Sequence, residues 1–151
     1  RDRTMTALYT SLQNRIQELI VGLALDEIED SSIVVAKLPW ARDMVVPGVR
    51  IAPEQDRNIP WTNEAYKTDL GVWVVYARVS NQNITGSLDV PNTWREAITA
   101  QFQAKDIVDQ LGIQRIYNCR VESGVVLWEK GFAAQHDVGS LRIIATATRP
   151  R

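Results

Sequence analysis

The residue types that most often carry enzymatic chemistry are scarce in this sequence, which holds a single histidine, His136, and a single cysteine, Cys119. A Ser–His–acid triad would need His136 beside a nucleophile, but the G-x-S-x-G pattern that presents such a serine does not occur. Cys119 alternates with Tyr117 and Val121, the spacing of one strand face, which favours a buried apolar role. We interpret His136 as a surface loop residue and expect no catalytic residue and no enzyme activity.

Metal and cofactor chemistry finds equally little support. Asp26, Glu27, Glu29 and Asp30 carry the carboxylates that hard cations prefer, but they lack the spacing and the glycine of a calcium loop. A solvated helix end that repels a passing polyanion is the alternative interpretation. The patterns G-x-G-x-x-G, G-x-x-x-x-G-K and C-x-x-C do not occur. The sequence therefore predicts no bound metal and no cofactor.

Composition limits the class of protein further. The chain has 151 residues, 45% of them apolar, which suits one globular domain spanning residues 1–151. One cysteine cannot form an internal disulfide, and this usage is typical of a reducing cytoplasm. The 17 basic and 18 acidic side chains give a net charge of −1, which argues against a protein that grips nucleic acid.

The sequence also carries no targeting signal that we can identify. No segment reaches the roughly 18 consecutive apolar residues of a membrane helix, and the start of the chain is too polar for a signal peptide. We therefore expect no membrane partner. The first four residues, 1–4, are expected to be flexible ahead of the domain.

The elements of the first half of the chain follow from apolar spacing and turn residues. Apolar residues at intervals of three and four predict a helix from about Thr6 to Leu23. A strand is predicted over Ile33–Leu38, and Pro47-Gly48 indicates a type II turn at the centre of a hairpin over Met44–Ile51. Residues 52–70 lack an apolar period, which predicts a long exposed loop.

The second half of the chain supplies further strands and another helix. Gly71–Val79 is apolar on both faces, which favours a central strand. Thr93 and Glu96 form a capping-box pattern that predicts the start of a helix with Trp94 on its apolar face. Three more strands are expected, over 114–122, 125–128 and 141–148. The predicted fold is α+β, a single domain with a mainly antiparallel β-sheet, two α-helices packed on one face and an extended hairpin or loop.

Five tryptophans offer a further indication of function. Trp73 and Trp94 are expected where the sheet meets the second helix, as core residues. Trp128 and the remaining two lie at strand ends or in loops, close to other apolar residues, and such groups commonly mark protein interfaces. The candidate interface residues are Trp40, Met44, Val46 and Trp61.

Several segments together resemble the tail terminator (tail completion or neck) proteins of tailed bacteriophages and prophage-like elements. They are the amphipathic helix TALYTSLQNRIQELI, the strand GVWVVYARVSNQN leading into the helix TWREAITAQF, and the closing strand DVGSLRIIATATR. The resemblance implies a structural virion protein that forms a hexameric ring at the head-proximal end of the tail. Such a ring caps the tail tube and joins it to the neck.

The resemblance also carries expectations about partners and location. The implied partners are other copies of the chain, the tail tube protein and a head-completion or neck protein, with DNA passing through the channel. The implied location is the virion tail or neck, assembled in the cytoplasm of the host bacterium. The candidate interface residues are then expected to contact neighbouring subunits or the tail tube, and the near-neutral charge suits a channel in which DNA slides.

Two alternatives remain open on the residues alone. One is another neck or head-completion protein. The other is a small α+β enzyme or ligand-binding domain with a pocket between sheet and loop, since fold class does not fix function. The polar candidates for that pocket are Glu64, Asp69, Tyr76 and Arg78.

Overall fold

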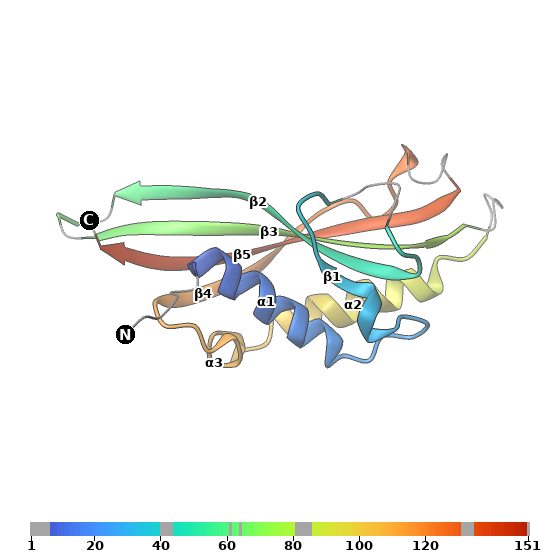
Figure 1. Ribbon diagram of the computed structural model, residues 1–151, viewed down its shortest axis with the longest axis horizontal. Helices are drawn as coiled ribbons and strands as arrows, with labels where there is room; N and C mark the ends of the chain where they lie inside the picture. The colour runs from blue at the N-terminus through green and yellow to red at the C-terminus, as the bar shows by residue number, and fades with distance from the viewer. Residues whose placement is uncertain are drawn as a thin grey trace.

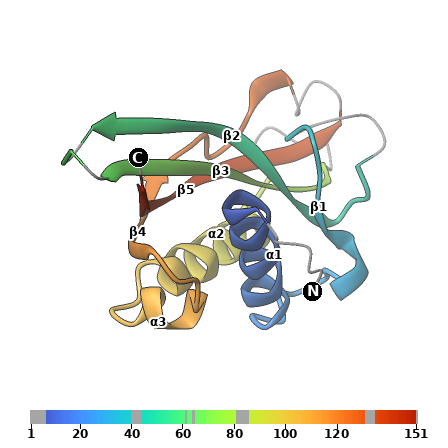
Figure 2. The same cartoon turned by 60° about the vertical axis from the view of Figure 1, so that its left-hand side comes forward.

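The computed structural model describes residues 7–39, 44–60, 62–63, 65–80, 86–130 and 135–150. Within these residues, one five-stranded sheet carries helices on one face, which confirms the α+β prediction (Figure 2). The elements in chain order are α1 (Leu8–Val21), the 3₁₀ helix η1 (Asp30–Ser32), β1 (Ile33–Val35), β2 (Gly48–Pro60), β3 (Ala65–Val79), α2 (Asp89–Phe102), α3 (Ile107–Leu111), β4 (Ile116–Ser123) and β5 (His136–Pro150).

The strand order across the sheet is β1-β2-β3-β5-β4. β1 runs parallel to β2, and the other neighbouring pairs are antiparallel. The middle strands β2, β3 and β5 are long, and their ends on one side of the molecule project beyond the helices (Figure 1). The molecule therefore has a helix-covered end and a projecting end.

The main core lies between the helices and one face of the sheet. Leu70, Val72, Val74 and Tyr76 alternate along β3 and point to the helices, and all are buried. α1 contributes residues four apart, Leu12, Ile16 and Ile20, and α2 contributes Trp94, Ile98 and Phe102. Each such side chain stabilises the fold by about 1.5–3 kcal/mol through burial.

The predicted loop over residues 52–70 is wrong, because its described residues form the C-terminal part of β2 and the N-terminal part of β3. The two strands pair from Gly48↔Ala77 to Pro60↔Tyr66, with a bulge between Pro53 and Asp56. Among the residues that the structure describes, β1 pairs with β2 at residues 49–51 and no strand pairs with that side of β2 beyond them. Proline and charged residues are common at sheet edges and bulges, which is why this strand has the composition of a loop.

The predicted hairpin centred on Pro47-Gly48 is also wrong. Residues 44–47 form no strand, and Gly48 is the first residue of β2. A Cβ on Gly48 would lie 2.3 Å from the carbonyl oxygen of Val45 and 2.9 Å from that of Ser32. The glycine is needed for this close backbone approach rather than for a turn.

The predicted start of the second helix falls one turn too late. α2 begins at Asp89, whose amide donates to the Ser87 hydroxyl at 3.0 Å. Thr93 lies inside the helix, and its hydroxyl donates to the Val90 carbonyl at 2.6 Å, so the capping box does not form. The first helix is confirmed, since α1 begins and ends within two residues of the predicted boundaries. Residues 1–4 lie outside the described part of the chain.

The remaining predictions differ mainly in length. β5 starts at His136, so the histidine is a half-buried strand residue and not a loop residue. β4 matches the strand predicted over 114–122, whereas residues 124–128 form no ladder strand. In the described part of the chain, no helix is both long and apolar enough to cross a membrane.

Candidate functional site

The face of the sheet opposite the helices, hereafter the open face, is the candidate functional site. Strand alternation assigns Asp69, Trp73, Val75 and Ala77 of β3 to this face, since their neighbours in sequence point to the helices. Trp73 was expected to pack between the sheet and the second helix, and that prediction is wrong. Trp94, on α2, is buried in the main core and meets Tyr76 edge-on with 6.2 Å between ring centroids.

A second, smaller core lies on the open face near the helix-covered end. Met44, Val75, Ala77 and Val138 are buried there, and Val46, Trp73 and Trp128 pack against them. Met44 is only 9% exposed, so most of its side chain packs against other residues of the same chain. The interface role of Met44 and Val46 stays a prediction, and Trp40 and Trp61 lie outside the described residues.

An apolar groove of about 230 Å³ adjoins this small core. It is lined by Pro39, Trp73, Val75, Val125, Trp128, Val138, Gly139 and Ser140. Trp128, grouped with the candidate interface by sequence, therefore does lie at an apolar surface outside the main core. The lining comes from four parts of the chain: the segment after β1, strand β3, the segment after β4 and strand β5.

One wall of the apolar groove is the segment 124–128, hereafter the strap. The strap is tied to β5 by two backbone hydrogen bonds, from Trp128 to the Val138 carbonyl and from Ser140 to the Val125 carbonyl, each 2.8 Å long. Val126 and Leu127, between these ties, are 51% and 37% exposed. Apolar side chains held outward by fixed backbone are a usual feature of protein-binding surfaces.

Arg95 of α2 fixes the start of the strap from the helical side. Its guanidinium donates to the carbonyls of Ser140 at 2.9 Å and Val125 at 3.1 Å, and to the Tyr76 hydroxyl at 3.0 Å. Burial raises the pKa of Tyr76, and the hydrogen bond and the charge of Arg95 oppose that rise. Arg95 therefore connects the main core to the wall of the apolar groove.

A charged cluster occupies the open face next to the apolar groove. Arg142 of β5 donates to both carboxylate oxygens of Glu54, at 2.5 and 2.6 Å, and to Glu122 of β4 at 2.8 Å. Gly71 makes room for this pairing, because a Cβ there would lie 2.6 Å from Glu54 Oε1. The hydrogen bonds to Glu54 raise the pKa of Arg142, burial opposes this rise, and the charges of Glu54 and Glu122 add to it.

The cluster continues across β3 and β4. Arg120 lies 3.6 Å from Asp69 and 3.4 Å from Glu122, while the Thr146 hydroxyl donates to Asp69 at 2.8 Å. Arg142 also lies over the Trp73 ring, 5.5 Å from its centroid, which links the charged cluster to the apolar groove.

The strands place a modest basic excess on the open face. By their register, the basic side chains of this face are Arg50, Arg57, Lys67, Arg120 and Arg142, and the acidic ones are Glu54, Asp69 and Glu122. Lys37 lies two positions before Pro39 and Lys130 two positions after Trp128, and both lysines are exposed.

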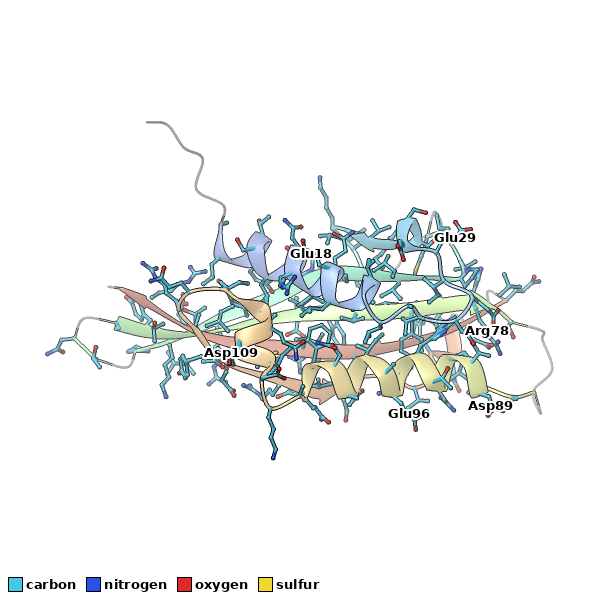
Figure 3. The ribbon with its side chains drawn as sticks, turned by 90° about the horizontal axis from the view of Figure 1, so that it is seen from below. Glu18, Glu29, Arg78, Asp89, Glu96 and Asp109 are labelled. Atoms are coloured by element: carbon cyan, nitrogen blue, oxygen red, sulfur yellow. The ribbon has the colours of Figure 1, made fainter. Side chains whose placement is uncertain are left out.

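The opposite side of the molecule has the reverse charge. Residues 8–32 and 86–111, hereafter the helical layer, carry nine acidic and three basic side chains. The acids, all exposed, are Glu18, Asp26, Glu27, Glu29, Asp30, Asp89, Glu96, Asp106 and Asp109. Figure 3 shows Glu18, Glu29, Asp89, Glu96 and Asp109 spread over this side. The described residues outside the helical layer carry ten basic and six acidic side chains, so the net charge of −1 conceals two layers of opposite sign.

The acidic segment after α1 is part of this charged surface. It is tied to α2 by the Trp94 indole, which donates to the Asp26 carbonyl at 2.9 Å. Among the described residues, no group of three or more metal-ligating side chains is close enough to hold an ion. The segment lies at the helix-covered end, where Figure 3 shows Glu29 on the opposite edge of the helical layer from Asp89 and Glu96.

The polar residues considered for a ligand pocket do not converge. Asp69 belongs to the charged cluster on the open face, whereas Tyr76 and Arg78 point to the helical side. Arg78 pairs with Asp137 at 3.3 Å, and Glu64 lies outside the described residues. Cys119 is half-buried against the main core, and burial raises the pKa of its thiol to about 11, consistent with the predicted apolar role.

The groupings that form the site were not predicted from the sequence. Arg142 and Glu54 are 88 residues apart, and no local pattern marks them as partners. The strap has one sequence signal, the apolar run Val125-Val126-Leu127 beside Trp128, which predicts a strand and not a wall of a groove.

Comparison with known protein families finds no family that matches this chain, and comparison with curated proteins finds no significant relative.

Proposed function

We propose that this chain is a structural subunit of a phage tail, forming a ring at the head-proximal end that caps the tail tube and joins it to the neck. DNA would pass through the channel of the ring. The proposal places the protein in the virion and gives it protein partners, namely further copies, the tail tube protein and a head-completion protein. It assigns no enzymatic role.

The observation that carries the proposal is the apolar end of the open face. Val126 and Leu127 are held outward by the strap, and Leu38 and Val45, exposed to 61% and 59%, belong to the segment that also supplies Pro39 to the groove. An exposed group of this kind supports association with proteins. The resemblance of the helix and strand segments to tail terminators then supports this particular assembly.

The shape of the groove favours a protein partner over a small ligand. Its volume of about 230 Å³ is below the roughly 300–1,000 Å³ of most ligand pockets, and its lining offers few polar side chains to orient a ligand. The projecting ends of β2, β3 and β5 give a subunit the reach to contact a second partner (Figure 1).

A complementation experiment tests the proposal. In a phage or prophage from which the gene is deleted, we expect tail tubes of irregular length without attached heads, and the wild-type gene should restore uniform, joined tails. The variant Val126→Asp/Leu127→Asp should fail to restore them, because it places two charges on the apolar surface.

The matched control is Tyr117→Ser, which removes a side chain of similar exposure, 45%, from the edge strand β4. This variant should restore normal tails. Normal tail length and normal head attachment in the deletion strain would contradict the proposed function.

A further inference from the structure

We propose that the ring, whose existence rests on the proposed function, is built by packing the acidic helical layer of one copy onto the open face of the next copy at the helix-covered end. The partner of the apolar groove is then a second copy of this chain. The contact joins two different surfaces, so it repeats from copy to copy in one direction.

The acidic side of this contact is formed by exposed carboxylates at the helix-covered end. Asp89 and Glu96 lie on α2 at that end of the helical layer, and Glu29 lies at the same end on the opposite edge of the layer (Figure 3). All three are exposed, so their charge is available to a partner.

The receiving side lies directly behind this region, across the sheet. Tyr76 contacts Trp94 on the helical side, while its neighbour Val75 lines the apolar groove on the open face. Exposed Lys37 and Lys130 adjoin the groove in the chain, and the open face has more basic than acidic side chains. Opposite charges on the two surfaces fix the register and orientation of an interface.

The position of both surfaces at one end has a geometric consequence. Copies stacked front to back form a heterologous contact, which closes into a ring when the rotation between neighbours divides a full turn. Because both surfaces lie at the helix-covered end, the projecting strands of every copy remain available for a different partner.

Charge reversal on each side separately, followed by mixing, tests this arrangement. The helical-side variant is Glu29→Lys/Glu96→Lys, and the open-face variant is Lys37→Glu/Lys130→Glu. Each alone should raise the dissociation constant of the oligomer by roughly 100-fold, because like charges then face each other. An equimolar mixture should reassemble, since every contact in an alternating ring pairs opposite charges again. Native mass spectrometry with one variant labelled with ¹⁵N should show equal numbers of the two variants.

Controls separate the possible failures. Asp56→Lys/Asp109→Lys changes two exposed carboxylates away from the groove end and should keep the wild-type mass, and thermal melting should show all variants folded. A wild-type oligomer with unaffected reversal variants, or a mixture that stays dissociated, would overturn this face assignment alone. A wild-type chain that stays monomeric would overturn the ring itself.

Discussion

Arg95 fixes one wall of the apolar groove to the helical side of the sheet. Its guanidinium donates hydrogen bonds to two carbonyl oxygens and to the Tyr76 hydroxyl. These hydrogen bonds connect α2 to the strap and to β5. A planar guanidinium can donate to several acceptors at once, which an ammonium cannot do with the same geometry.

Replacement of Arg95 by Met is expected to lower the free energy of unfolding by about 2 kcal/mol, because several acceptors, most of them partly buried, lose a charged donor. Urea denaturation measures this change. Arg95→Lys should recover only part of the loss, and Asn92→Met, at an exposed position of the same helix, should stay within about 0.5 kcal/mol of wild type. Equal stability of Arg95→Met and wild type would contradict the role of the residue.

The reactivity of the Cys119 thiol tests whether this side chain is buried. Burial raises its pKa to about 11, so the thiolate is rare at neutral pH. The rate of iodoacetamide alkylation in the folded protein should rise about tenfold per pH unit and continue to rise past pH 9, where an ordinary thiol levels off. The raised pKa also means that the thiol favours the folded state up to about pH 9 and that this contribution is lost as the pH approaches 11. A plateau below pH 9 would show an exposed thiol.

At the scale of elements, the long ribbon of β2 and β3 shows what the sequence could and could not predict. Helix α1 and the apolar half of β3 follow from their own residues, since α1 buries one regular face and this half of β3 is apolar on both faces. The polar half of the ribbon does not, because its strands are stabilised by pairing with each other and with β5. Propensity describes single residues, whereas this pairing joins segments far apart in the chain.

The same limit applies to the candidate site. The apolar groove was indicated only by Trp128 and the residues beside it, because its lining depends on how the strap folds back on β5. The charge of each layer is present in the sequence, but the near-balance of the whole chain hides it until helices and strands are assigned to opposite sides.

The charged cluster joins the bulge of β2 to the neighbouring strands β5 and β4. A double-mutant cycle with Glu54→Gln and Arg142→Met should give a coupling energy of about 1–2 kcal/mol, since the pair is bidentate and partly buried. The exposed pair Arg15–Glu18, one turn apart on α1, should give about 0.3–0.5 kcal/mol in the same urea measurement. Equal coupling in both pairs would contradict a special role for the bulge.

At the scale of the whole molecule, the two sides differ in chemistry in a way that suits directional assembly. The helical layer is acidic and polar, and the open face combines an apolar groove with a basic excess. A surface that cannot pair with itself favours head-to-tail contacts, whose simplest closed product is a ring. Electrostatic complementarity of this kind weakens with added salt, so the assembly should be sensitive to ionic strength.

Negative-stain electron microscopy of the purified protein at low salt tests the central claim most directly. We expect particles that average to a closed ring with a central hole, with six subunits if the tail terminator resemblance is correct. Particles that remain compact monomers across the accessible concentration range would contradict the account.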